Sequence, residues 1–180
     1  MATRREIYNQ LIRVAMECYP EEEARQIAEM IITSLGGISR NDLIIEPNIP
    51  LEIADLESIC DDIRRWRPVQ YIIGYAEFAD MELHVSEGVL IPRPETEELV
   101  EWIANEAPYG AKILDVCTGS GCIALALRRA VQNSEVWGLD LSTEALTVAR
   151  KNAAIYAPDV HFVEGDALGD FDSNVACKSF

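Results

Sequence analysis

The stretch that decides the fold is Ile113-Leu114-Asp115-Val116-Cys117-Thr118-Gly119-Ser120-Gly121. It starts with a short, mostly apolar run and ends in small residues with two glycines, which is typical of a buried strand leading into a tight turn. A helical pattern of apolar residues follows over 121–131. A strand, a glycine turn and a helix in this order place the turn at the carboxyl edge of a parallel sheet, where nucleoside cofactors bind.

The same alternation continues beyond this stretch. Residues 135–139 form a second apolar run, Ser142 suits the cap of a helix over 142–154, and residues 160–164 form a third run. Short apolar strands that alternate with helices indicate a parallel sheet in a doubly wound α/β domain. We therefore expect residues 92–180 to be the first half of such a domain.

The beginning of the chain has a different pattern. Apolar residues recur at helical spacing in residues 1–67, and Pro20, Gly36-Gly37 and Pro68 separate the segments. This pattern predicts a small helical bundle. The side chains expected to face its core are Ile7, Leu11, Val14, Cys18, Ala24, Ile27, Ala28, Ile31, Leu35, Leu56, Ile59, Cys60, Ile63 and Trp66.

The sequence pattern changes again in residues 68–91. Residues 71–78 and 81–90 are rich in residues that favour strands, and Ala79-Asp80 lies between them, so we expect a β-hairpin that links the two domains. A helix should then start near Pro94, whose fixed backbone angle suits a first turn. The side chains expected to be buried along that helix are Leu99, Val100, Trp102 and Ile103.

Composition narrows the class of protein. The 180 residues are 49% hydrophobic and 26% charged, which is the balance of a globular protein, and the net charge is −16. Such a charge repels a phosphate backbone, so we expect no direct binding to nucleic acid. No apolar run approaches the roughly 20 residues that span a bilayer, and we expect a cytoplasmic protein without a membrane segment. The five cysteines and two histidines lack metal-ligand spacing, so we expect free thiols and no metal site.

The glycine turn by itself fits two kinds of cofactor. The run from Gly119 to Ala124 also matches the dinucleotide fingerprint, and Asp140 lies close to the offset of about 20 residues at which a carboxylate holds ribose hydroxyls. A carboxylate at Asp115 would repel a pyrophosphate but suits the positively charged amino-sulfonium group of a methyl donor. The methyl donor S-adenosyl-L-methionine is favoured for this reason. Asp166 follows the third strand, where a side chain can meet an adenine amino group; the alternative is that it is a solvated loop acid.

Three blocks resemble the release factor glutamine methyltransferases of the HemK/PrmC family. The first is Arg67-Pro68-Val69-Gln70-Tyr71-Ile72-Ile73-Gly74, the second is Gly88-Val89-Leu90-Ile91-Pro92-Arg93-Pro94-Glu95-Thr96-Glu97, and the third is the stretch from Ile113 to Gly121. The resemblance implies a helical substrate-recognition domain, a hairpin and a Rossmann-like class I methyltransferase domain. It also implies that S-adenosyl-L-methionine is bound by Cys117, Thr118, Gly119, Ser120, Gly121, Asp140, Asp166 and Ala167. Asp115 joins this expected site on the charge argument given above.

Two positions depart from the family's pattern. The family has glycine where Cys117 stands, and some members carry a larger, adenine-stacking residue in place of Ala167. The family's catalytic signature, Asn-Pro-Pro-Tyr, is not found in these 180 residues. We therefore assign no catalytic residue and expect the catalytic groups to lie beyond Phe180. We also expect the first strand to lack its neighbour on one edge. The chain by itself should be unable to transfer methyl groups.

The leading hypothesis is methylation of a glutamine amide in a peptide chain release factor. Two alternatives remain open from the sequence. One is a related methyltransferase that acts on a glutamine of a ribosomal protein or on an adenine amine. The other is a non-catalytic fragment that only binds the cofactor or a partner protein.

Overall fold

The computed structural model describes residues 1–169, which divide into two compact units after Ile73. The boundary therefore lies after Ile73 rather than after residue 67, and the hairpin belongs to the second unit instead of standing between two domains. Each unit has its own hydrophobic core, so the two can be treated separately. Among the described residues, no helix is long and apolar enough to cross a membrane.

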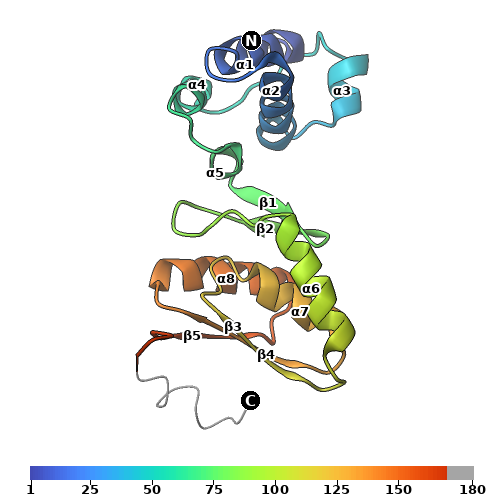
Figure 1. The fold of residues 1–180 in the computed structure, drawn as a ribbon. Helices are drawn as coiled ribbons and strands as arrows, with labels where there is room; N and C mark the ends of the chain where they lie inside the picture. Colours follow the sequence, from blue (N-terminus) through green and yellow to red (C-terminus); the bar gives the residue numbers. More distant parts are fainter. Residues whose placement is uncertain (170–180) are drawn as a thin grey trace. The chain divides into compact units, whose positions relative to one another are not determined.

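The first unit consists of helices whose ends are set by local chemistry. They are α1 (Arg4–Ala15), α2 (Glu21–Gly36), α3 (Arg40–Ile45), α4 (Leu56–Arg64) and α5 (Val69–Ile73) (Figure 1). Thr3 and Ser39 each form a reciprocal capping box, with Glu6 and with Asp42, that satisfies free backbone N–H groups at the starts of α1 and α3. Gly37 ends α2 in the left-handed conformation that glycine adopts without strain.

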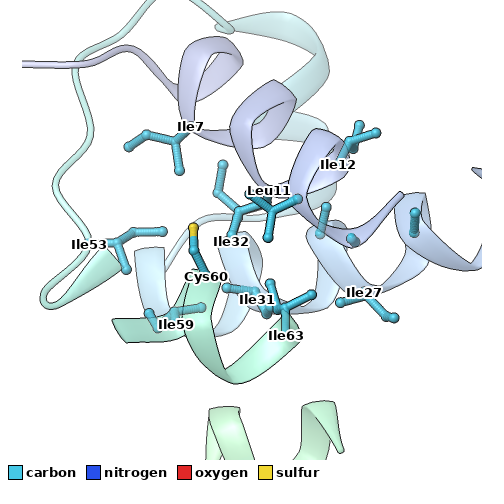
Figure 2. Close-up of a cluster of buried hydrophobic side chains, with 14 of the residues drawn as sticks. Ile7, Leu11, Ile12, Ile27, Ile31, Ile32, Ile53, Ile59, Cys60 and Ile63 are labelled. Carbon is cyan, nitrogen blue, oxygen red and sulfur yellow. The ribbon is translucent and has the colours of Figure 1, made fainter. Parts of the chain in front are cut away.

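Apolar side chains from α1, α2 and α4 converge to form the first core. Figure 2 shows Leu11, Ile31, Ile32, Cys60 and Ile63 pointing toward one another between these helices, and each is at most 1% exposed. Helical spacing in the sequence predicted four of the five, because residues three and four apart lie on one face of a helix. The bundle expected from the sequence is confirmed.

Three details of the first unit differ from the expectation. Leu35 is exposed, and Ile32 takes its place in the core. The helix α4 ends at Arg64, so Trp66 lies beyond it with a φ of 60°, exposed on one side and packed against the ring of Tyr19. Residues 69–73 form helix α5 rather than the beginning of a strand.

The reason for α5 is visible in its spacing. Val69, Ile72 and Ile73 stand three and four residues apart and pack against the helical core. Pro68 precedes them and accepts hydrogen bonds from the amides of Tyr71 and Ile72. A strand would have placed these apolar side chains on opposite faces. A helix places them on one face, where all three can pack against the bundle, and the segment is therefore helical.

The second unit begins with the hairpin of β1 (Tyr75–Phe78) and β2 (Met81–His84), which pair antiparallel. The hairpin expected around Ala79-Asp80 is present, but its second strand ends at His84 and the chain then turns. The rest of the unit alternates helices and strands: α6 (Glu95–Glu106), β3 (Lys112–Val116), α7 (Cys122–Ala130), β4 (Glu135–Asp140), α8 (Thr143–Tyr156) and β5 (His161–Glu164).

Strands β3, β4 and β5 form a parallel sheet in that order, as the alternation predicted. Within this unit, α7 and α8 cover the sheet face that looks toward the hairpin (Figure 1). In the part of the chain that the structure describes, β3 lies at one edge of the sheet and β5 at the other. All three strands point the same way, so the ends of β3 and β4 that carry candidate site residues meet at one edge.

Helix α6 is less buried than its sequence indicated. Val100 is buried and Ile103 is partly buried, but Leu99 and Trp102 are exposed. The helix packs along one side against α7, so only one narrow stripe of α6 is covered. Trp102 lies outside this stripe, and its ring N–H donates to the Glu106 carboxylate.

Candidate functional site

The turn between β3 and α7 reverses the chain over a few residues with three backbone positions in the left-handed region. The φ angles are 62° at Cys117, 57° at Gly119 and 81° at Gly121. Glycine reaches this region at no steric cost, whereas a side chain at Cys117 is strained there. The turn is thus set by two glycines and one residue that is held against its preference.

The two glycines serve different purposes. A Cβ at Gly121 would stand 3.3 Å from the Cβ of Ala149 in α8 and 3.2 Å from the ring of Phe162, so this glycine allows close packing of the turn on its own unit. A Cβ at Gly119 would meet nothing within 4 Å. The Gly119 backbone therefore borders open space, as a backbone that receives a ligand must.

Asp115 lies on the buried side of this turn and holds the turn in place through hydrogen bonds. Its carboxylate accepts hydrogen bonds from the Thr118 hydroxyl at 2.6 Å and from the Ala124 amide at 3.2 Å, and the residue is only 9% exposed. Burial raises the pKa of the Asp115 carboxyl above its ordinary value, and the nearby charge of Asp140 adds to the rise, while the two hydrogen bonds oppose it. The structure thus gives Asp115 a supporting position under the turn.

Asp140 ends β4 directly beside the turn. One of its carboxylate oxygens accepts from the Gly119 amide at 2.8 Å, and the other accepts from the Ser142 amide at 2.9 Å. The Thr118 amide donates to the neighbouring carbonyl of Leu139 at 3.0 Å. The glycine turn and the second strand end, 21 residues apart in sequence, are therefore joined at one edge of the sheet.

The third strand brings the remaining predicted residues to the same edge. The Gly165 amide donates to the Asp140 carbonyl at 3.0 Å, which places Asp166 and Ala167 just past this contact. Both are exposed, and the Asp166 carboxylate accepts from the Leu168 amide. Leu141, which follows Asp140 and is 68% exposed, adds an apolar surface that sequence reasoning missed. The sequence feature that could have identified Leu141 is its position, since it is an apolar residue directly after a carboxylate at the end of a strand.

The five residues of the turn are not equally accessible. Cys117 is exposed and Gly119 is partly so, but Thr118, Ser120 and Gly121 are buried. The carbonyl of Ser120 accepts from the side chain of Asn152 at 2.9 Å, another residue that sequence reasoning did not single out. A ligand on this turn would therefore meet the backbone of Cys117 and Gly119 first.

The edge has no sign of a metal centre in residues 1–169, since no group of three or more metal-ligating side chains occurs there. Cys117 and Cys122, like Cys18 and Cys60 in the first unit, carry free thiols. Cys177, the fifth cysteine, lies outside the described residues. What the edge offers is the accessible backbone of Cys117 and Gly119, the carboxylates of Asp140 and Asp166 and the apolar side chain of Leu141. These groups suit a ligand with hydroxyl groups, positive charge and a flat ring.

Comparison with known families divides the chain in the same way. Residues 9–74 match the family model described as the PrmC N-terminal domain, and residues 113–177 match a model described as a methyltransferase domain. The first match covers most of the helical unit, and the second begins in β3 and contains the glycine turn, Asp140 and Asp166.

Several curated relatives match across both units. A release factor glutamine methyltransferase of Flavobacterium psychrophilum is 36% identical over 173 residues, which are 92% of this chain and 61% of that relative. Proteins of the same name from Bacteroides thetaiotaomicron and Lactococcus lactis are 41% and 44% identical over 76% and 74% of this chain. The chain spans 50% of the length of each of these two.

The strained φ at Cys117 predicts that glycine would be preferred there. We expect Cys117→Gly to raise the free energy of unfolding of the second unit by about 1 kcal/mol, because it removes the Cβ clash of the left-handed conformation. Cys117→Ala is the matched control, since it removes the thiol but keeps the Cβ. Urea denaturation of the three proteins checks this, and an equal gain for alanine and glycine would contradict it.

The raised pKa of Asp115 predicts a pH effect on stability. Below about pH 3.9, the ordinary aspartate pKa, the Asp115 carboxyl is protonated in both the folded and the unfolded protein. As the pH rises from there through the raised pKa of the folded protein, the unfolded protein loses this proton more readily, so the free energy of unfolding decreases. Asparagine does not titrate. The free energy of unfolding of the wild type minus that of Asp115→Asn should therefore decrease as the pH rises from below about 4, then become constant. Urea denaturation of both proteins at a series of pH values measures it, and a difference that increases with pH would contradict it.

Proposed function

Because the chain belongs to the family of the release factor glutamine methyltransferases, we propose that the protein methylates the glutamine side-chain amide of a peptide chain release factor. S-adenosyl-L-methionine would be the methyl donor, and the reaction would take place in the cytoplasm. The observation that carries the proposal is the combination of two units. A helical unit of the PrmC type precedes a glycine turn that is bonded to the Asp140 carboxylate at the edge of a parallel sheet.

The residues at this edge suit the parts of the cofactor. The Asp140 carboxylate would accept hydrogen bonds from the ribose hydroxyls, and the exposed backbone at Cys117 and Gly119 would lie against the methionine part. Leu141 offers an apolar surface for the adenine ring, and the Asp166 side chain would accept from the adenine amino group. Ala167, which is exposed, would complete the lining, and the buried residues Thr118, Ser120 and Gly121 would support the turn from behind. The cofactor supplies an electrophilic methyl group bound to a sulfonium.

Charge favours a cationic ligand over a pyrophosphate at this turn. The charge of Asp140 adds to the rise in the pKa of Asp115, so the site already contains two neighbouring acids. A pyrophosphate would add two further negative charges to this environment. The sulfonium and ammonium groups of the methyl donor would instead be attracted, even though Asp115 acts from below the turn.

The direct test uses the full-length protein. Unmethylated release factor is incubated with it and with a labelled methyl donor, and mass spectrometry then locates the label. We expect one methylated glutamine amide in the release factor. Label on a ribosomal protein or on a nucleic acid, with none on the release factor, would contradict the proposed substrate while leaving the cofactor assignment intact.

Asp140 gives a sharper test of the cofactor site. Asp140→Ala should weaken binding of S-adenosyl-L-methionine by about 2 to 3 kcal/mol, because two charge-assisted hydrogen bonds to the ribose are lost together. Glu164→Ala is the matched control, since Glu164 is an exposed acid that pairs with Asp140 in the sheet register. Titration calorimetry measures both. An unchanged dissociation constant for Asp140→Ala, or equally tight binding of NAD, would remove the assignment.

We propose that the helical unit recognises the release factor, because the cofactor unit can hold its ligand without a bundle and some surface must choose the protein partner. Deleting this unit from the full-length protein should raise the KM for intact release factor much more than the KM for a short glutamine peptide. Steady-state kinetics with both substrates measure the two effects. Equal increases would mean that the helical unit is structural only.

A further inference from the structure

Asn152 is a polar residue in the middle of α8 that has no solvent exposure at all. A buried amide is retained only where its hydrogen-bonding groups are satisfied, since each unpaired group would cost free energy. Its side chain has three partners. The oxygen accepts from the His84 amide at 2.7 Å, and the nitrogen donates to the carbonyls of His84 at 3.0 Å and Ser120 at 2.9 Å.

These partners fix the orientation of the amide group. An asparagine side chain has two N–H donors, and here both point at carbonyl oxygens while the side-chain oxygen faces an N–H group. Turning the amide over would set oxygen against two carbonyls and nitrogen against a donor. The group therefore has one arrangement, and both partner segments must be in place for it to form.

The two partner segments lie far apart in sequence and differ in their relation to the site. His84 is the last residue of β2, in the hairpin, and Asn152 binds both its N–H and its C=O. Ser120 stands between the two glycines of the turn and is 1% exposed, so its carbonyl is held from behind while the Gly119 backbone remains open on the other side. One side chain thus ties the hairpin to the turn.

We propose that Asn152 is a positioning residue, which ties the turn at Gly119 and Gly121 to the hairpin and keeps this turn in the conformation that binds the methyl donor. The link to the methyl donor rests on the proposed function. The link between hairpin and turn rests only on the three hydrogen bonds.

The chain contains a matched control for this proposal. Tyr156 lies one helical turn after Asn152 in α8, and its hydroxyl accepts from the Glu82 amide at 2.9 Å and donates to the Glu82 carbonyl at 3.0 Å. It therefore holds the same strand β2 from the same helix, and in residues 1–169 its hydroxyl makes no hydrogen bond to the turn. Tyr156→Phe loosens the contact between hairpin and helix, whereas Asn152→Ala also releases the carbonyl of Ser120.

Amide hydrogen exchange in the chain without cofactor tests the structural link. The amides of Gly119 and Gly121 donate to Asp140 and Thr118, so exchange there reports opening of the turn. Asn152→Ala should accelerate exchange at both glycines about tenfold, whereas Tyr156→Phe should accelerate Glu82 and leave the glycines within about twofold of the wild type. Asn152→Ser is a milder second variant in case alanine prevents folding.

Binding of S-adenosyl-L-homocysteine, measured by calorimetry on the same proteins, tests the functional link. Asn152→Ala should weaken binding about tenfold, and Tyr156→Phe should leave it unchanged. Equal effects of the two variants on the turn, or no effect of Asn152→Ala on it, would overturn the proposal. If the wild-type chain binds no S-adenosyl-L-homocysteine, the proposed function fails at its cofactor, and hydrogen exchange still decides whether Asn152 positions the turn.

Discussion

The second unit depends on a single constraint, which is that the chain must pass from β3 into α7 through a turn with three left-handed residues. Such a turn has few internal hydrogen bonds, and its conformation is not the one that an unconstrained backbone prefers. Other segments must therefore hold it. Three polar side chains do so from different elements: Asp115 from the strand before the turn, Asp140 from the next strand and Asn152 from the following helix.

The distribution of these three contacts explains why the site is open on one side only. Asp115 and Asn152 are buried and bind the turn from within the unit, at the Thr118 hydroxyl and the Ser120 carbonyl. Asp140 is only partly buried and binds the Gly119 amide at the rim. A ligand can thus approach the backbone of Gly119 while the rest of the turn stays fixed, which is the preorganisation that a cofactor site requires.

The helical unit is stabilised in a different way from the second unit. Its core is formed by aliphatic side chains from three helices, and its surface is held by exposed ion pairs such as the one between Arg25 and Glu21. Pairs of this kind stabilise a protein little, so the apolar core must supply most of the stability. A unit with its own core can be joined to a second unit without altering it.

The sequence by itself determined the two classes of structure and which of the residues predicted for the site meet at one edge of the sheet, because both follow from local patterns. Helical spacing, proline and glycine breaks and the strand–turn–helix order of residues 113–131 are short-range signals, and the offset from Gly121 to Asp140 follows from the length of one helix and one strand. Tertiary structure alone decided that residues 69–73 form a helix, since the bundle offers the surface that their side chains bury. It also decided which face of α6 packs against α7 and leaves Trp102 exposed, and that Asp115 supports the turn from inside the unit. Above all, it brought His84, Ser120 and Asn152 together, and no local pattern can encode contacts between residues that the folded chain alone makes neighbours.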